Sequence, residues 1–305
     1  MNRIRTIKAL VVDDSAFNRS AISQMLAIDT GIEVVGTAID GVDAIGKTLR
    51  LSPDVITLDL EMPNMDGFTF LRWLMKERPT PVLVISSRSD SRSVFRALEL
   101  GAVDFLAKPE ARISKSLEGI REELLMKVRA MPLLEMGKVR STVDLLARER
   151  VAPAVRKDEE TTPRKSVIEI VAIAASTGGP PALQAILSGL PGDLGAGIVI
   201  SQHMPPGVPR EPSDKYVPSA DRMMASVAEA CGSAVLGVVL TGMGNDGTAG
   251  ALAIKRLNGQ CIAESQESAV IFGMPQEVIR SGAVDKVLPL SRMADEISFR
   301  CSGRA

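Results

Sequence analysis

The 305-residue chain contains few cysteines, few aromatic residues and a single histidine. Its three cysteines, Cys231, Cys261 and Cys301, are odd in number, far apart and without a CxxC pair. This spacing argues against a disulfide framework and a zinc site, and it favours a reducing, cytoplasmic location. The one histidine is His203, so a reaction that needs an imidazole base has only this residue to supply it.

Long apolar runs and an excess of one charge are also absent. No apolar stretch approaches the ~20 residues that a membrane helix needs, so direct membrane insertion is not expected. The first apolar stretch is broken by Asp13 and Asp14, so no signal peptide is expected. Lys and Arg number 36 and Asp and Glu 37, so nucleic acid is not expected as a partner. The composition is that of a globular protein, and the length suits two domains.

The first half of the chain alternates short apolar runs with amphipathic ones. Strands are predicted at residues 7–12, 32–38, 54–58, 81–86 and 103–107. Helical patterns lie between them, for example at 16–28 and 66–78. Repeated β–α units of this length predict a parallel sheet with helices on both faces. In such sheets ligands bind beyond the carboxyl ends of the strands.

Polar side chains gather at those predicted strand ends. Asp13 and Asp14 follow the first strand, Asp59 ends the third, Ser86 ends the fourth and Lys108 follows the fifth. Carboxylates that face one point repel each other unless a cation joins them, and their hard oxygen atoms favour Mg²⁺. A lysine and a hydroxyl beside them would complete a phosphoryl site. The alternative is that these acids are solvated loop residues or helix caps.

These residues lie in stretches that resemble the response-regulator receiver domain. The stretches are VVDDSAFNR, ITLDLEMPNMDG, VLVISS and GAVDFLAKP, and the resemblance covers residues 6–130. It implies a (βα)5 flavodoxin-like fold in which Asp59 accepts a phosphoryl group. It further implies that Mg²⁺ is held by Asp13, Asp14, Asp59 and the backbone carbonyl of Glu61, that Ser86 and Lys108 contact the phosphoryl group, and that Phe105 is the switch residue.

A connector is expected over residues 131–166. Its later part is charged, has little apolar content and carries Pro153 and Pro163. Such a composition is typical of an exposed linker. The earlier part, residues 136–150, is also compatible with a helix.

In the second half, three apolar strand candidates each lead to one chemically useful residue. These are Ser176, His203 and Asp246. A serine hydroxyl becomes nucleophilic when an imidazole takes its proton, and a carboxylate commonly fixes the tautomer of that imidazole. Amides at the start of the helix after Ser176 could stabilise an oxyanion. The alternative for this turn, which contains Gly178 and Gly179, is a helix N-cap, and the chain has no GxSxG motif.

The same region offers a competing interpretation. Gly242, Gly244 and Gly247 form a GxGxxG pattern after a strand, and Glu264 follows about twenty residues later, as in the dinucleotide-binding fingerprint. However, Asp246 would place a carboxylate beside the pyrophosphate, which is repulsive. This alternative also leaves the serine and the histidine without a role.

Several stretches of the second half are similar to the catalytic domain of the CheB family of chemotaxis protein-glutamate methylesterases. They are IAASTGGPPAL, SQHMPPG, PSADRMMASVAE, VVLTGMGNDGTAG and FGMPQEVI, within residues 167–299. The resemblance implies a second doubly wound α/β domain with a mostly parallel sheet. It also implies site residues: Ser176 as nucleophile, His203 as general base, Asp246 as orienting acid, Thr177 beside the nucleophile and the Met243 amide as oxyanion donor.

A receiver joined by a linker to such a domain is the architecture of this family. The resemblance therefore implies a response regulator, activated by phosphorylation, that removes methyl esters from glutamates of methyl-accepting chemotaxis receptors. Many family members also deamidate receptor glutamines. The implied partners are a chemotaxis histidine kinase and the receptors, and the catalytic domain is expected to need no cofactor.

The sequence departs from the family pattern between His203 and Ser219. The family continues for several dozen residues after HMPPG, whereas only VPREPSDKYV precedes PSADRMMASVAE here. Strand candidates are missing, so a smaller core is expected. Two interpretations therefore remain open: an active enzyme, or a catalytically impaired relic that serves as a phosphorylation-gated binding module.

Overall fold

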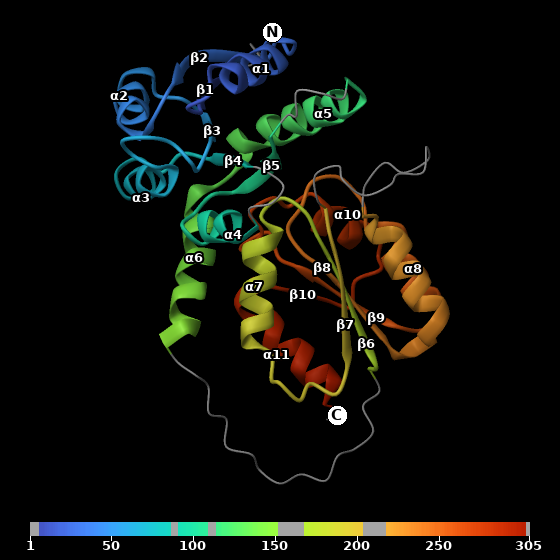
Figure 1. Ribbon diagram of the computed structural model, residues 1–305. Coiled ribbons are helices and arrows are strands. Elements are labelled where there is room, and N and C mark those ends of the chain that lie inside the picture. The colour runs from blue at the N-terminus through green and yellow to red at the C-terminus, as the bar shows by residue number, and fades with distance from the viewer. Residues whose placement is uncertain (1–5, 87–90, 109–113, 152–167, 204–217, 303–305) are drawn as a thin grey trace. The chain divides into compact units, whose positions relative to one another are not determined.

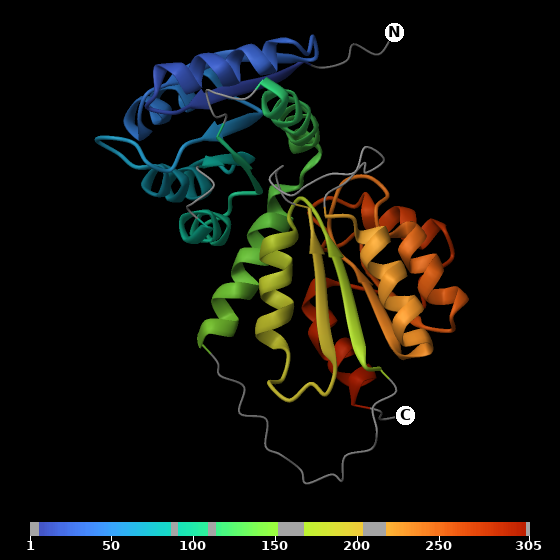
Figure 2. The ribbon, with the colours of Figure 1, turned by 45° about the vertical axis from the view of Figure 1, so that its right-hand side comes forward.

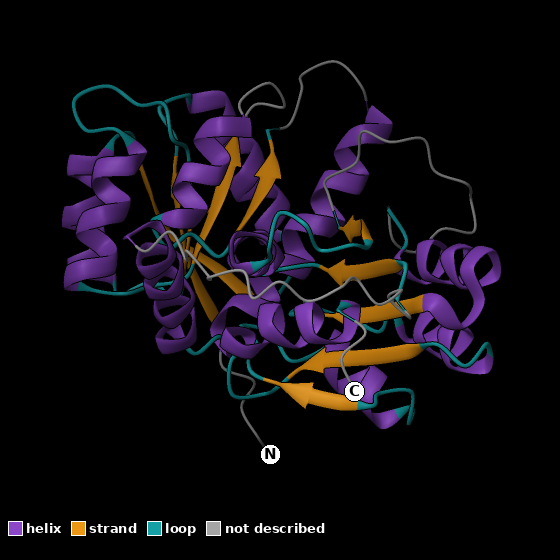
Figure 3. Ribbon diagram, turned by 90° about the horizontal axis from the view of Figure 1, so that it is seen from below, coloured by secondary structure: helices purple, strands orange, loops and turns teal. Residues whose placement is uncertain are grey.

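The computed structural model describes residues 6–86, 91–108, 114–151, 168–203 and 218–302 (Figure 1). Among these residues, contacts define two compact units, one running to Val139 and the other beginning at Arg140. Each unit is an α/β domain with one parallel five-stranded sheet, and the arrows of each sheet point the same way (Figure 3). This confirms the predicted fold class. None of the described helices combines the length and apolar character needed to cross a membrane.

The sheet of the first unit has the strand order β2-β1-β3-β4-β5. Its strands are β1 (Ile7–Val12), β2 (Ile32–Ala38), β3 (Val55–Leu58), β4 (Val82–Ser86) and β5 (Asp104–Ala107). The helices are α1 (Ala16–Ala27), α2 (Gly41–Leu51), α3 (Gly67–Glu77), α4 (Ser91–Glu99) and α5 (Ser114–Ala130), followed by the 3₁₀ turn η1 (Met131–Leu133). Because parallel strands are covered on both faces, β3 and β4 are buried along their whole length.

Short polar side chains start the helices of this unit. Ser15 caps α1, Asp40 caps α2 and Asp66 caps α3, each accepting a hydrogen bond from the amide three residues later. These caps satisfy amides that have no partner inside a helix. Helices α1 and α2 begin within four residues of the ends of β1 and β2, whereas a longer loop separates β3 from α3.

The sheet of the second unit has the strand order β10-β9-β8-β6-β7. Its strands are β6 (Ile170–Ala175), β7 (Gly197–Gln202), β8 (Val235–Val239), β9 (Gln260–Glu264) and β10 (Lys286–Leu288). The helices are α7 (Gly179–Gly189), α8 (Ala220–Cys231), α9 (Thr248–Arg256), α10 (Met274–Arg280) and α11 (Leu290–Cys301), with the 3₁₀ turn η2 (Gly232–Ala234). Helices α7 and α11 cover one face of this sheet, and α8 and α10 lie on the other (Figure 1). Apolar side chains of α7 and α11 form one core with the sheet, and those of α8, α9 and α10 form another.

The predicted connector contains one described helix. Helix α6 (Met136–Val151) occupies its earlier part, and Leu145 on this helix packs against the core that contains α7 and α11. Residues 152–166 of the predicted connector lie outside the described residues. Most of the shortened segment, residues 204–217, also lies outside them.

Strand β7 is the outermost described strand on its side of the sheet, next to β6 (Figure 2). Its side chains Val199 and Ile200 are 37% and 39% exposed. They belong to adjacent positions and therefore to opposite faces of the sheet. Parallel strands are normally covered on both faces, so both faces of β7 are incompletely covered. The exposure fits the smaller core expected from the shortened sequence.

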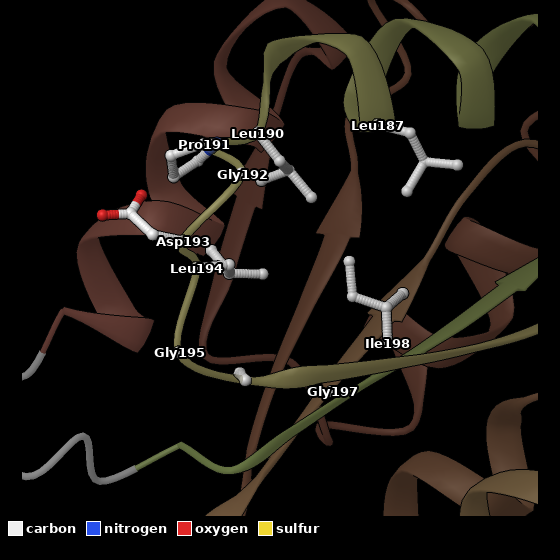
Figure 4. A pocket seen from close by; sticks show the side chains of 10 residues that line it. Leu187, Leu190, Pro191, Gly192, Asp193, Leu194, Gly195, Gly197 and Ile198 are labelled. Atoms are coloured by element: carbon white, nitrogen blue, oxygen red, sulfur yellow. The ribbon is translucent and has the colours of Figure 1, made fainter.

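A cavity of about 710 Å³ opens at the amino end of β7 (Figure 4). Its apolar lining comes from the end of α7, the turn after it and the start of β7, with Leu187, Leu190, Leu194 and Ile198 facing inward. His203 follows the opposite, carboxyl end of β7. The cavity is therefore separate from the site formed by the strand ends.

Candidate active site and phosphorylation site

Three acidic residues meet at the carboxyl edge of the first sheet. Asp13 follows β1 and Asp59 follows β3, and these two strands are parallel neighbours. One carboxylate oxygen from each of Asp13, Asp14 and Asp59 lies within 4.8 Å of the others. Oxygen donors that converge from carboxylates are the ligands that Mg²⁺ prefers. The residues present therefore fit the implied metal.

Lys108 balances the charge of this acidic cluster. Its Nζ lies 2.6 Å from Asp59 Oδ2 and 3.5 Å from Asp13 Oδ2. Burial raises the pKa of Asp59, the Lys108 hydrogen bond opposes this effect, and the charge of Asp13 adds to it. Burial alone would lower the pKa of Lys108, but the hydrogen bond and charge of Asp59 raise it. The site thus holds concentrated negative charge beside one ammonium group.

The other residues predicted for the first site surround the same edge. The Glu61 amide donates to Asp59 Oδ1 at 3.4 Å. Ser86 ends β4, and its carbonyl accepts a hydrogen bond from the Lys108 amide at 2.8 Å. Phe105 lies further back, inside β5, and its carbonyl accepts a hydrogen bond from Lys127 Nζ at 2.9 Å. The structure thus places Ser86 and Lys108 side by side at the strand ends, with Phe105 behind them.

In the second unit, Ser176 lies in a tight turn between β6 and α7. Gly178 has φ +78°, a left-handed conformation that favours glycine. A Cβ on Gly178 would lie 2.9 Å from Val270 Cβ, and one on Gly179 would collide with the Gln202 side chain. The Gly179 amide donates to the Ser176 carbonyl at 2.7 Å. Because the Gly179 amide already donates within the turn, the oxyanion donor has to be a different amide.

The serine, the histidine and the acid are brought together from three adjacent strands. Strand β6 lies between β7 and β8, so Ser176, His203 and the loop with Asp246 meet at one edge. His203 Nδ1 lies 3.0 Å from Ser176 Oγ, and His203 Nε2 lies 2.8 Å from Asp246 Oδ2. Because Nδ1 must be free to accept the serine proton, the ring proton belongs on Nε2. The ring is thus turned the opposite way from the serine-protease template, in which Nε2 faces the serine.

The start of α8 holds the Asp246 carboxylate. The amides of Ala220 and Asp221 donate to it at 2.7 and 2.9 Å, and the Ser219 hydroxyl donates at 3.3 Å. Burial acts to raise the pKa of Asp246, but hydrogen bonds from His203 and from these amides outweigh it and lower the pKa. A helix N-terminus also favours an anion. Asp246 therefore remains ionised opposite the imidazole.

Sequence reasoning did not identify these donors from α8. A serine immediately before an amphipathic run is a helix-start signal, and Ser219 has this position. That signal predicts where α8 begins. It does not reveal that the helix start faces Asp246, because the two segments meet only through the packing of α8 against the sheet.

The loop after β8 packs directly against the nucleophile. A Cβ on Gly242 would lie 2.7 Å from Ser176 Cβ and would collide with the Met274 sulfur. Met243 is the next residue in this loop. Thr177 is buried, and its carbonyl accepts a hydrogen bond from Thr241 Oγ1 at 3.0 Å. This hydrogen bond joins the serine turn to the loop that contains Met243.

This packing explains the glycine pattern without a dinucleotide. Gly242 is needed for the close approach to Ser176, and Gly247 has φ +94°. Glu264, the acid at the spacing of the fingerprint, is buried and accepts hydrogen bonds from the Thr241 amide and the Ser268 hydroxyl, both at 2.9 Å. Its carboxylate is therefore committed to the interior of the domain. The dinucleotide-binding alternative is therefore not favoured.

Comparisons with known proteins agree with this geometry. The sequence model of the response regulator receiver domain matches residues 9–118, and that of the CheB methylesterase matches residues 171–212 and 208–297. A protein named protein-glutamate methylesterase/protein-glutamine glutaminase 3 from Geobacter sulfurreducens is 43% identical, with 98% of each chain covered. Proteins with the same enzyme name from Myxococcus xanthus and Anaeromyxobacter dehalogenans are 40% and 37% identical, and cover 93% and 99% of this chain and 94% and 98% of their own.

The relatives also carry residues that this chain lacks. The alignment with the Geobacter sulfurreducens protein is 364 residues long, whereas this chain has 305. The CheB methylesterase match falls in two segments that overlap at residues 208–212, between His203 and Ser219. The similarity nevertheless extends over nearly the full length on both sides of this point. The chain therefore belongs to the CheB methylesterase family, with a response regulator receiver domain ahead of the methylesterase domain.

Proposed function

We propose that this chain is a phosphorylation-activated chemotaxis hydrolase that demethylates glutamate methyl esters of chemoreceptors. The observation that carries this proposal is the hydrogen-bonded series from Ser176 Oγ through the His203 ring to Asp246 Oδ2. Each member occupies the position that acyl transfer requires: a hydroxyl next to a base, and the base next to a buried carboxylate.

The proposed reaction begins with attack of Ser176 Oγ on the ester carbonyl while its proton moves to His203 Nδ1. Asp246 stabilises the imidazolium through Nε2, and the Met243 amide, beside Thr177, is the proposed oxyanion donor. The tetrahedral intermediate then expels methanol, which takes the proton from Nδ1. Water attacks the acyl-enzyme by the same route and regenerates the serine. With a glutamine side chain the leaving group is ammonia, so the same residues serve deamidation.

In the receiver unit, the proposed phosphoryl acceptor is Asp59. Asp13, Asp14, Asp59 and the Glu61 carbonyl would hold Mg²⁺, which supplies positive charge to the phosphoryl oxygens when bound. Ser86 and Lys108 would contact the phosphoryl group, and Phe105 would respond as the switch. The converging carboxylates and the Lys108–Asp59 contact of 2.6 Å support this assignment.

The proposed partners follow from these two activities. A chemotaxis histidine kinase would supply the phosphoryl group, and methyl-accepting chemotaxis receptors would supply the ester. The three cysteines are free thiols, which suits the reducing cytoplasm where we place the reaction.

The catalytically impaired alternative is not favoured. It rested on the shortened sequence after His203, which was expected to disturb the geometry of the site. The described structure brings Ser176, His203 and Asp246 to within hydrogen-bond distance in series. The curated relatives, which match over nearly the whole chain, are named as enzymes.

The test is methanol release from a methylated receptor. Ser176→Ala and His203→Gln should each remove nearly all turnover, and the double variant should be no worse, because residues of one catalytic unit act together. Ser188→Ala, an exposed serine on α7, is the matched control and should retain full activity. Wild-type turnover in His203→Gln would contradict the proposal, because no other histidine is present.

A further inference from the structure

In the catalytic unit, the N-terminal amides of α8 and of α9 each donate hydrogen bonds to an acidic residue that belongs to the other helix or to the loop before it. Asp246, just ahead of α9, accepts hydrogen bonds from the amides of Ala220 and Asp221 at the start of α8. Asp221, on α8, accepts a hydrogen bond from the Gly250 amide in the first turn of α9 at 2.8 Å. Each helix start is thus held by a carboxylate that belongs to the other helix segment.

This exchange compensates for a missing cap. The first amides of a helix have no partner within it and carry partial positive charge. The N-cap residue of α9 is Gly247, which has no side chain to accept these amides, whereas α8 begins with Ser219. Asp221 therefore supplies the acceptor that α9 lacks in its own sequence.

The two helices are also closely packed where the exchange occurs. A Cβ on Gly250 would lie 2.6 Å from Met224 Cβ and 3.1 Å from the Asp221 Cα. The Asp221 carboxylate and this contact therefore fix the same point of α8 against α9. Because the start of α8 also supplies donors to Asp246, its position sets where the Asp246 carboxylate lies relative to His203.

We propose that Asp221 is a positioning residue that locks α8 onto α9 so that Asp246 stays in line with His203 Nε2. This inference rests on the proposed function, because Asp246 matters only if His203 is the base. The Asp221 carboxylate accepts a hydrogen bond from the Gly250 amide and is not proposed to touch the substrate. It would act on the reaction only through the position of Asp246. Loss of the Asp221 carboxylate should therefore lower kcat and leave KM unchanged. A misplacement of about 1 Å costs on the order of a hundredfold in rate, so we expect a loss of roughly 10- to 100-fold in Asp221→Ala.

The single histidine gives a direct readout of this positioning. In the ¹⁵N-labelled full-length protein, every imidazole nitrogen signal comes from His203. The wild type should show the neutral ring protonated on Nε2, held by Asp246. Asp221→Ala should show a mixture of both neutral tautomers, because Nε2 loses its fixed acceptor. Asp221→Asn keeps an oxygen for the Gly250 amide and should recover most of the wild-type tautomer and rate.

Glu229→Gln is the matched control, because it removes an exposed acid from the same helix. It should match the wild type in kcat and tautomer. A folded Asp221→Ala protein with wild-type kcat and one tautomer would overturn the inference. If Asp221→Ala fails to fold, Asp221→Ser replaces it, with the same two outcomes. A wild type without turnover would instead overturn the proposed function, and the tautomer comparison would still decide the role of Asp221.

Discussion

Asp59 is a buried acid, and its burial disfavours the ionised form of the carboxyl group. Burial raises its pKa in the folded state above the unfolded value. The stability that this group contributes is therefore present at low pH and is lost as the pH rises through the folded-state pKa. The ionised form of this carboxylate is therefore less favourable in the folded receiver than the protonated form.

Asp59→Asn should therefore raise the melting temperature of the receiver at pH 7 in the presence of a chelator. The difference should shrink as the pH falls and the wild-type carboxyl becomes protonated. Added Mg²⁺ should reverse the order, because a metal that binds only the folded state stabilises it, and the variant has lost one ligand. Differential scanning calorimetry at several pH values tests this, with the exposed Glu77→Gln as control. Equal melting temperatures for wild type and variant under chelation would contradict the expectation, and the variant should also fail to accept phosphate.

At the residue scale, the candidate site residues that could be predicted from the sequence are those that directly follow a strand. Asp13, Asp59 and Ser176 follow strand ends, and parallel strand ends meet at one edge, so their grouping could be predicted. The sequence could not identify Asp221 or the amides of α8 around Asp246. Those contacts depend on the packing of one helix against another, and no local pattern encodes that packing.

At the element scale, the strands of the receiver were largely predictable. The patterns at 7–12 and 32–38 coincide with β1 (Ile7–Val12) and β2 (Ile32–Ala38). The other three predicted strands each begin one residue before the observed one, because Asp54, Pro81 and Val103 precede the paired residues. The bounds of these strands are predictable because each strand is a short apolar run, and polar residues that end the run lie next to it in the sequence. The exposure of both faces of β7 was less predictable, because the apolar pattern of a strand does not reveal whether helices cover it.

The loop after β8 provides a prediction about a single element. Gly242→Ala should displace Ser176 or Met274, because the added methyl has no space between them. We expect a loss of most esterase turnover together with a lower melting temperature. Gly46→Ala is the contrasting control: it lies inside α2 with nothing within 4 Å of the added Cβ. It should stabilise the receiver by about 0.5–1 kcal/mol, since alanine favours a helix. Unchanged turnover in Gly242→Ala would show that the loop does not support the nucleophile.

At the scale of the whole molecule, the receiver is expected to restrict the catalytic unit until Asp59 is phosphorylated. A modification can shift such an equilibrium only by its differential free energy between the two states, so activation should be bounded. Methanol release should be slow for the full-length protein and faster for its phosphorylated form. The catalytic half without residues 1–134 should match the phosphorylated form. Equal rates for all three proteins would rule out this control.

The order of strands in the second sheet has a consequence for chain length. Ser176, His203 and Asp246 follow β6, β7 and β8, which are consecutive in the sheet. Material added or removed beyond β7 changes the rim of the sheet and leaves this trio of strands adjacent. A change of chain length after His203 therefore need not separate the three strands that lead to Ser176, His203 and Asp246. The length of the chain at this rim of the sheet and the geometry of the three residues can vary independently.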